Sequence, residues 1–121
     1  MKYKWLDGYL LNRPGAVKEF HESFQVDRYL VGGKMFAMWG GDKMGRPILT
    51  LKLDPLRGDD LRQQYPGEIV PGYYMNKLHW NSLYLEGDVP DELVKSMIDE
   101  SYAILLNSLP IKARAAIMGE A

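Results

Sequence analysis

The residues best suited to binding chemistry are concentrated in residues 71–86, where aromatic, amide, cationic and imidazole side chains follow one another. Two lysines on earlier predicted strands belong to the same cluster. Cations and amides beside aromatic rings are the groups with which proteins hold phosphates and stack bases. The candidate ligand-binding or nucleic-acid-binding residues are therefore Lys34, Lys52, Asn76, Lys77, His79, Trp80 and Tyr84. The alternative is that Trp80 packs under the last helix and the lysines are only solvated.

Enzymatic and metal chemistry find less support in the sequence. The two histidines, His21 and His79, are far apart and the chain has no cysteine, so the spacing of a zinc site is absent. A general base at His79 would need a partner geometry that sequence does not give, and a histidine bonded to the backbone is the simpler interpretation. Residues 32–34 lack the glycine spacing and the following serine or threonine of a phosphate loop. We expect no catalytic residue, no metal and no cofactor.

Length and composition indicate one folded domain over residues 1–121, with 46% hydrophobic and 26% charged residues. No apolar run approaches the roughly 20 residues that span a bilayer. The basic N-terminus lacks the apolar block of a secretory signal. Together with the absence of cysteine, these features predict a cytoplasmic protein that does not bind membranes. Residues 110–121 have few apolar side chains, so we expect a tail that frays or adds one weak turn.

The net charge of −1 argues against a protein that holds nucleic acid mainly by neutralising phosphates. The distribution is uneven, because bases outnumber acids by eight to five over residues 28–82, whereas six acids accompany Lys95 in residues 86–100. Such a separation would orient a polyanion, but it is also typical of an ordinary solvated surface.

Hydrophobic spacing predicts the elements that position these residues. A short helix over residues 3–11 ends at a proline and a glycine. The apolar residues of 16–27 clearly fit neither the helical period of 3.6 residues nor the strand period of two. Residues 28–31 and 34–39 form a hairpin around Gly32-Gly33, and the strand over residues 47–53 alternates with leucines on one face. The result is a three-stranded antiparallel meander. A polar helix follows over residues 58–65, capped by Asp59 or Asp60.

The second half supplies two strands, joined near residues 76–77, and a long helix. If Leu83 and Leu85 lie in the core, alternation sends Trp80, Ser82 and Tyr84 to the opposite face and His79 toward the core. The last helix begins around residues 88–92 and ends before the proline at position 110. The predicted fold is α+β, a two-layer α-β(3)-α-β(2)-α arrangement with helices on one face of an antiparallel sheet.

Over about residues 9–109 the chain resembles the MmcQ/YjbR-like family of small bacterial proteins. The motifs that carry the resemblance are Leu11–Gly15, Gly33–Phe36, Leu51–Pro55, Pro71–Lys77, His79–Asn81 and Ser101–Tyr102. The resemblance implies the same element order, shared with type III secretion chaperones. It also implies DNA binding through a double-wing arrangement of hairpins, and it supplies no catalytic residue. Where the family often has histidine, this chain has Tyr74.

Three functions therefore stay open. The leading hypothesis is a non-enzymatic binding module, with DNA or another nucleic acid as ligand. The second is a chaperone-like module that holds a peptide or a second copy of the chain through the sheet face or the acidic last helix. The third is an enzyme that acts on a small anionic ligand through Lys77 and His79. A positive face, a broad apolar patch and a closed pocket around His79 would favour the first, second and third respectively.

Overall fold

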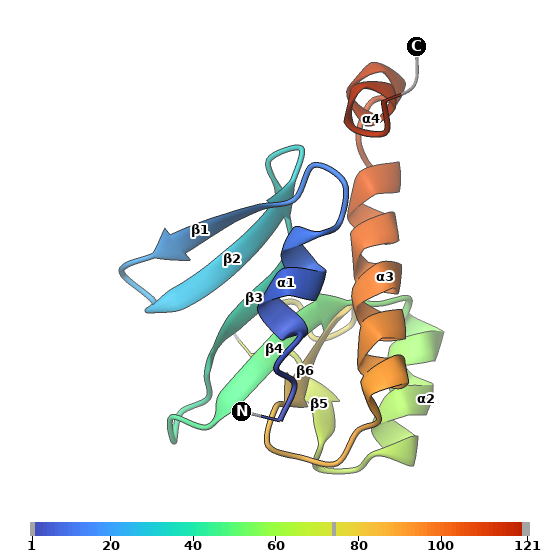
Figure 1. Ribbon diagram of the computed structural model, residues 1–121. Helices are drawn as coiled ribbons and strands as arrows, with labels where there is room; N and C mark the ends of the chain where they lie inside the picture. The colour runs from blue at the N-terminus through green and yellow to red at the C-terminus, as the bar shows by residue number, and fades with distance from the viewer. Residues whose placement is uncertain (1, 74, 120–121) are drawn as a thin grey trace.

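The protein forms two layers, a six-stranded antiparallel sheet and a set of helices (Figure 1). The computed structural model describes residues 2–73 and 75–119. The strands, in spatial order β1-β2-β3-β4-β6-β5, are β1 Val17–His21, β2 Val26–Val31, β3 Lys34–Gly41, β4 Pro47–Lys52, β5 Ile69–Pro71 and β6 Trp80–Tyr84. The helices are α1 Leu6–Leu11, α2 Pro55–Gln64, α3 Asp91–Asn107 and α4 Ile111–Ile117. The α+β two-layer class is confirmed, with β1 and α4 added to the predicted order.

The first half of the sheet is a meander of four strands, one more than predicted. The hairpin turn at Gly32 and Gly33 is confirmed, and both residues have positive φ angles, +56° and +80°. The additional strand, β1, pairs with β2 from Val17↔Leu30 to His21↔Val26. Most of its side chains are exposed, so it lacks the apolar alternation that identifies a half-buried strand.

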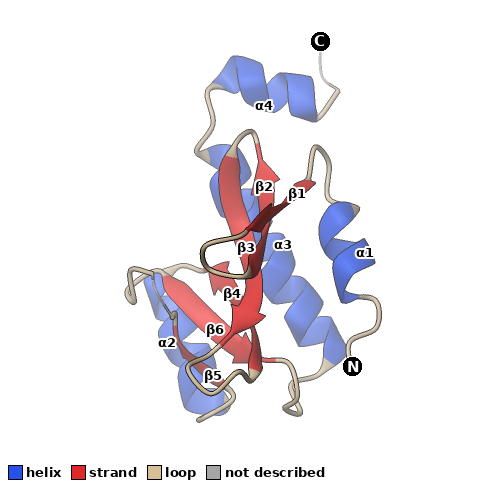
Figure 2. Ribbon diagram, turned by 90° about the vertical axis from the view of Figure 1, so that its left-hand side faces the viewer, coloured by secondary structure: helices blue, strands red, loops and turns tan. Residues whose placement is uncertain are grey.

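The core lies between the sheet and the helices. Leu49 on β4 is paired with Leu83 on β6, and both side chains are fully buried. They belong to one cluster with Met97, Ile98 and Leu105 on α3. In Figure 2 the sheet lies in front of α3, so the helices cover one face and leave the other open. Among the described residues no helix has the length and apolarity needed to cross a membrane.

Helix α2 begins earlier than predicted, because its cap is Asp54. The Asp54 carboxylate accepts a hydrogen bond from the backbone N–H of Leu56 at 2.9 Å, and Pro55 occupies the first turn. Proline at that position has no N–H to leave unsatisfied. Asp59 and Asp60, the predicted caps, lie inside the helix instead.

Residues beyond the long helix are more ordered than the sequence indicates. Helix α4 has no fully buried residue, yet Ile117 packs against the main core. A Cβ on Gly15, whose φ is +71°, would lie 2.9 Å from a methyl group of Ile117. The glycine therefore makes room for the side chain that anchors α4.

Replacing Leu51 by alanine tests the position of β4 in the core. Leu51 is fully buried, and removing its side chain should lower the free energy of unfolding by about 2 to 5 kcal/mol. Chemical denaturation measures the change. Leu56→Ala, at a side chain that is 82% exposed, is the control and should change stability by less than about 0.5 kcal/mol. An unchanged midpoint for Leu51→Ala would place β4 outside the core.

Candidate functional site

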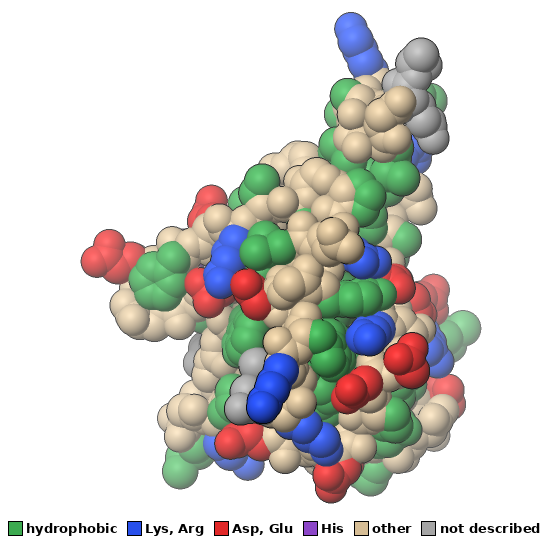
Figure 3. Space-filling view, in the orientation of Figure 1, with side chains coloured by type: hydrophobic (Ala, Val, Ile, Leu, Met, Phe, Trp, Pro, Cys, Tyr) green, Lys and Arg blue, Asp and Glu red, His purple; other side chains and the backbone are tan. Residues whose placement is uncertain are grey.

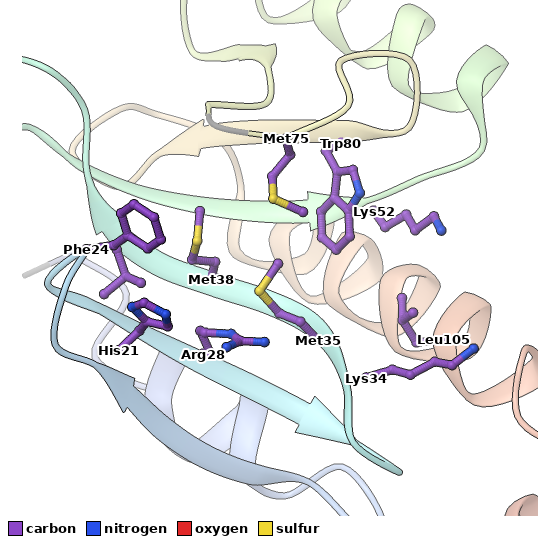
Figure 4. A pocket seen from close by; sticks show the side chains of 11 residues that line it. His21, Phe24, Arg28, Lys34, Met35, Met38, Lys52, Met75, Trp80 and Leu105 are labelled. Atoms are coloured by element: carbon purple, nitrogen blue, oxygen red, sulfur yellow. The ribbon is translucent and has the colours of Figure 1, made fainter.

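A groove of about 550 Å³ lies on the open face of the sheet. The β1–β2 hairpin forms one wall, the loop between β5 and β6 contributes to the other, and β3 lies between them (Figure 4). The apolar and aromatic side chains that line it are Phe24, Val26, Met35, Met38, Met75, Trp80 and Leu105. The polar and cationic ones are His21, Arg28, Lys34 and Lys52. The groove thus combines an apolar floor with three cations.

Strand register explains why these side chains meet. Lys52 on β4 is paired with Trp80 on β6, and Arg28 on β2 is paired with Met38 on β3. Directly paired residues of antiparallel strands point to the same face. The β2–β3 register shifts between Tyr29 and Leu30, so Met35 lines the groove together with Met38 although they are three positions apart. In a regular strand, residues three apart would point to opposite faces.

The three cations differ in how their charge is compensated. The Arg28 guanidinium lies 2.9 Å from the Glu19 carboxylate. The Lys34 ammonium donates a hydrogen bond to the Ser108 hydroxyl at 3.1 Å, and the Lys52 ammonium lies 6.0 Å from the centroid of the Trp80 ring. Within the described part of the chain neither lysine has a carboxylate partner, and no acid lines the groove. The groove is therefore electropositive.

Two stacked rings mark the hairpin side of the groove. The rings of His21 and Phe24 lie 4.8 Å apart at an interplanar angle of 25°, and Phe24 is 70% exposed. The β1–β2 hairpin that carries them projects from the body of the molecule (Figure 1) and bears hydrophobic side chains near its end (Figure 3). The buried Nδ1 of His21 has no hydrogen-bond partner among the residues that the structure describes.

Of the candidate residues chosen from sequence, the structure brings Lys34, Lys52 and Trp80 together. All three line the groove, and Trp80 lies on the open face together with Lys52 (Figure 4). The alternative that Trp80 packs under the last helix is therefore wrong. The parity argument that sent Trp80, Ser82 and Tyr84 away from the core leucines is confirmed by the β4–β6 register.

Three other candidates shape the loop between β5 and β6 instead of lining the groove. The Asn76 side chain accepts a hydrogen bond from the Leu78 N–H at 2.9 Å. The Lys77 ammonium donates to the Gly72 carbonyl, also at 2.9 Å. His79 is half-buried and its carbonyl accepts from the N–H of Leu53. Tyr74, the departure from the family pattern, lies outside the described residues.

Tyr84 belongs to a separate polar network at the other end of β6. Its hydroxyl donates to the buried carboxylate of Asp42 at 2.8 Å, and Arg46 donates to the same carboxylate at 2.8 Å. The hydroxyls of Tyr73 and Tyr84 lie 3.1 Å apart. That hydrogen bond, together with burial and the bond to Asp42, raises the pKa of Tyr84. The network fastens the β3–β4 turn to β6.

Sequence reasoning missed several residues of the groove. His21 and Phe24 belong to residues 16–27, where the spacing of apolar residues indicates neither a helix nor a strand, so their place on a hairpin was not predicted. Arg28 could have been found, because it lies on a predicted strand next to the predicted strand that carries Met38, and alternation along each strand indicates which side chains share a face. Met35 could not have been found by alternation, since the register shift decides its face.

The side of the molecule shown in Figure 3 lacks this separation of charge. On the side shown in Figure 3, acidic and basic side chains are interspersed over α1 and α3. Arg13 pairs with Asp99 and Lys18 with Asp7, each at 2.9 Å. Residues 2–73 and 75–119 contain no group of three or more histidines and carboxylates arranged to hold a metal ion.

Comparison with known proteins gives consistent matches. The family model described as YjbR matches residues 11–104. Uncharacterized protein YjbR of Escherichia coli (strain K12) is 32% identical over 110 residues, which cover 91% of this chain and 92% of that protein. The crystal structure of Deinococcus radiodurans protein DR2400, which has a DUF419 domain, superposes with a TM-score of 0.82 at 31% identity and covers 96% of this chain and 86% of its own. A Pseudomonas syringae protein of 23% identity shares the fold, with a TM-score of 0.72 over 87% of this chain and 99% of its own.

Replacing Asp42 by asparagine tests the polar network. Burial acts to raise the pKa of Asp42, but hydrogen bonds from the backbone of Arg46 and Met44 and from the Tyr84 hydroxyl outweigh it, and the pKa falls to about 2. An unfolded aspartate titrates near 3.9, so the ionised carboxylate stabilises the fold above that pH and loses its effect as the pH falls toward 2.

Asp42→Asn should therefore be less stable than the parent at pH 7, and the difference should shrink between about pH 4 and pH 2. Urea denaturation at several pH values measures it. Asp60→Asn, which changes an exposed carboxylate on α2, is the control. A stability difference that stays constant across this range would mean that ionised Asp42 contributes nothing to folding.

Proposed function

The chain belongs to the YjbR family, and from the chemistry of its groove we propose that it is a non-enzymatic binding module for single-stranded nucleic acid. The observation that carries the proposal is the combination, in one groove, of three cations with apolar and aromatic side chains. Arg28 and Lys52 project from the open face of the sheet, and Lys34 lies at the end of the groove beside α3. Proteins that hold single strands combine a positive groove, which follows the phosphates, with aromatic rings on which bases stack.

A single strand fits the groove better than a duplex does. A duplex presents phosphates and groove edges, so Trp80 and the methionines of the floor would have no base to contact. The net charge of −1 also gives little of the phosphate neutralisation on which duplex binding depends. An unpaired strand exposes the faces of its bases, and these can cover apolar side chains.

Each part of the groove has a role in this proposal. Lys34 and Lys52 contact phosphates, because they are the cations of the groove without a carboxylate partner in the described part of the chain. Arg28 adds a weaker contact, since Glu19 already compensates its charge. The exposed ring of Phe24, supported from behind by His21, provides a surface on which a base stacks.

The first test is the salt dependence of binding to a fluorescein-labelled ten-nucleotide oligodeoxythymidine, followed by fluorescence anisotropy. Two or three phosphate contacts predict a log–log slope of about −1.4 to −2.1, at about −0.7 per contact on single strands. Lys52→Ala or Lys34→Ala should weaken the slope by about 0.7. Lys112→Ala, which removes a lysine from α4 outside the groove, should leave it unchanged.

The competing function, binding of a peptide, predicts a different result in the same assay. A groove lined by methionines also suits an apolar peptide, because thioether side chains adapt to varied partners. An acidic amphipathic peptide is therefore titrated in parallel. If the peptide binds and the oligonucleotide does not at low salt, the module recognises protein and the nucleic-acid proposal is abandoned.

The second test removes the stacking ring. Phe24→Ala should cost about 1 to 3 kcal/mol of binding free energy on the same oligonucleotide, with little change in the salt slope, because no charge is lost. Its stability should be nearly that of the parent, since the side chain is 70% exposed. Leu56→Ala, equally apolar and exposed on α2, serves as the control for lost surface hydrophobicity. Equal affinity of the two variants would exclude Phe24 from the site.

A further inference from the structure

We propose that the groove binds the end of a single strand, with a terminal phosphate at Lys34 and Lys52 and the adjoining bases toward Phe24. This inference rests on the proposed function and adds which part of a strand is recognised. The observation behind it is an uneven distribution of charge along the groove. The two lysines lie at one end, and the exposed ring of Phe24 lies at the other (Figure 4).

Helix α3 holds both lysines at the same end of the groove. The Ser101 hydroxyl accepts a hydrogen bond from the Lys52 N–H at 2.9 Å, and the Ser108 hydroxyl accepts one from the Lys34 ammonium at 3.1 Å. Leu105 lies between these serines on the same side of the helix, because residues three and four apart share a face, and it lines the groove. In Figure 4 the two lysine side chains extend in the same direction, one on each side of Leu105.

The end of the groove beside α3 is positive. Within the described part of the chain neither Lys34 nor Lys52 forms an ion pair with a carboxylate. An ammonium has three N–H donors, so Lys34 keeps donors for a ligand besides the one bonded to Ser108. The C-terminus of a helix carries about half a negative elementary charge, which the two lysines outweigh. This end therefore suits a compact anion.

The hairpin end of the groove is poorly suited to a phosphate. The nearest cation, Arg28, is directly paired with Glu19 of β1, and their charged groups lie 2.9 Å apart. The other lining side chains there are apolar or aromatic, namely Phe24, Val26 and Met38. A phosphate at this end would approach the Glu19 carboxylate, whereas the face of a base would cover the apolar side chains. The ligand should thus carry its charge at the lysine end alone.

This distribution suits the end of a strand better than its interior. An interior segment carries one negative charge per phosphate, spaced about 3.4 Å apart in a stacked strand, so a groove that follows it needs cations along its length. A terminal phosphate instead concentrates about −1.5 to −2 charges at one point. Lys34 and Lys52 supply two positive charges there. Strand β3 advances about 13 Å from Lys34 to Met38, a length that about three or four stacked nucleotides cover.

The first test compares competitors that carry equal charge in different places. Each displaces the fluorescein-labelled ten-nucleotide strand at low salt, followed by fluorescence anisotropy. Two are four-nucleotide oligodeoxythymidines with a phosphate at the 5′ or the 3′ end, and the third is a six-nucleotide strand with two hydroxyl ends. All three carry about five negative charges at neutral pH. At least one phosphorylated competitor should bind about tenfold more tightly than the six-nucleotide strand, and its phosphorylated end gives the direction of the strand.

The second test assigns this preference to the two lysines. Lys34→Ala and Lys52→Ala should each reduce the preference at least about threefold, because the charge-assisted hydrogen bonds of one ammonium are lost. Lys52→Arg keeps the charge and should retain the preference. Lys112→Ala, on α4 outside the groove, is the control and should also retain it. A preference that survives the loss of either lysine would overturn the proposal.

The competition separates this inference from the proposed function. If the labelled strand binds, but neither phosphorylated competitor exceeds the six-nucleotide strand, the groove holds the interior of a strand. The proposed function then stands and recognition of a terminal phosphate is excluded. If the labelled strand does not bind at low salt, both the proposed function and this inference are wrong.

Discussion

The pairing of β4 with β6 is the constraint on which the rest of the structure depends. It joins the four-stranded meander to the last two strands, and it sets Leu49 opposite Leu83 on the core face. The same register sets Lys52 opposite Trp80 on the open face. A slip of one residue would send every side chain of one strand to the other face. The leucine core and the floor of the groove are therefore two results of one register.

Helix α3 determines which face becomes the groove. Its Ser101 hydroxyl accepts a hydrogen bond from the N–H of Lys52 at 2.9 Å and donates to the carbonyl of Phe36 at 2.6 Å. Beside it, the Tyr102 ring packs edge-on against Phe36, and its hydroxyl donates to the carbonyl of Pro14. The buried serine and the tyrosine thus fasten the helix to β3, β4 and the segment between α1 and β1. With α3 fixed on one side, the opposite face stays open.

The open face becomes a groove because two irregular features border it. The β1–β2 hairpin projects away from α3 (Figure 1), and its turn contains Gln25 at a φ of 53°. The shift in the β2–β3 register brings a second methionine to the floor. Strand β1 contributes little to the core, since it is mostly exposed, whereas Phe36, which lies at the register shift, is fully buried in the core. The hairpin side of the site, at His21 and Phe24, is thus largely separate from the parts of the chain that stabilise the fold, as is common when binding residues lie on loops and hairpins carried by a rigid scaffold.

The sequence by itself determined the fold class, the Gly32-Gly33 hairpin, the leucine face and the open-face position of Trp80. Those features follow from the side-chain period of two residues in a strand and 3.6 residues in a helix, and from the ability of glycine to adopt a positive φ. These are local properties of the chain. Only the tertiary structure decided which polar residues share a site. Lys77, His79 and Trp80 are close in sequence, yet only Trp80 lines the groove, because a loop has no fixed alternation. His21, Phe24 and Met35 join it from an exposed hairpin and a register shift. Those positions are set by pairing between strands, a long-range interaction that no local pattern records.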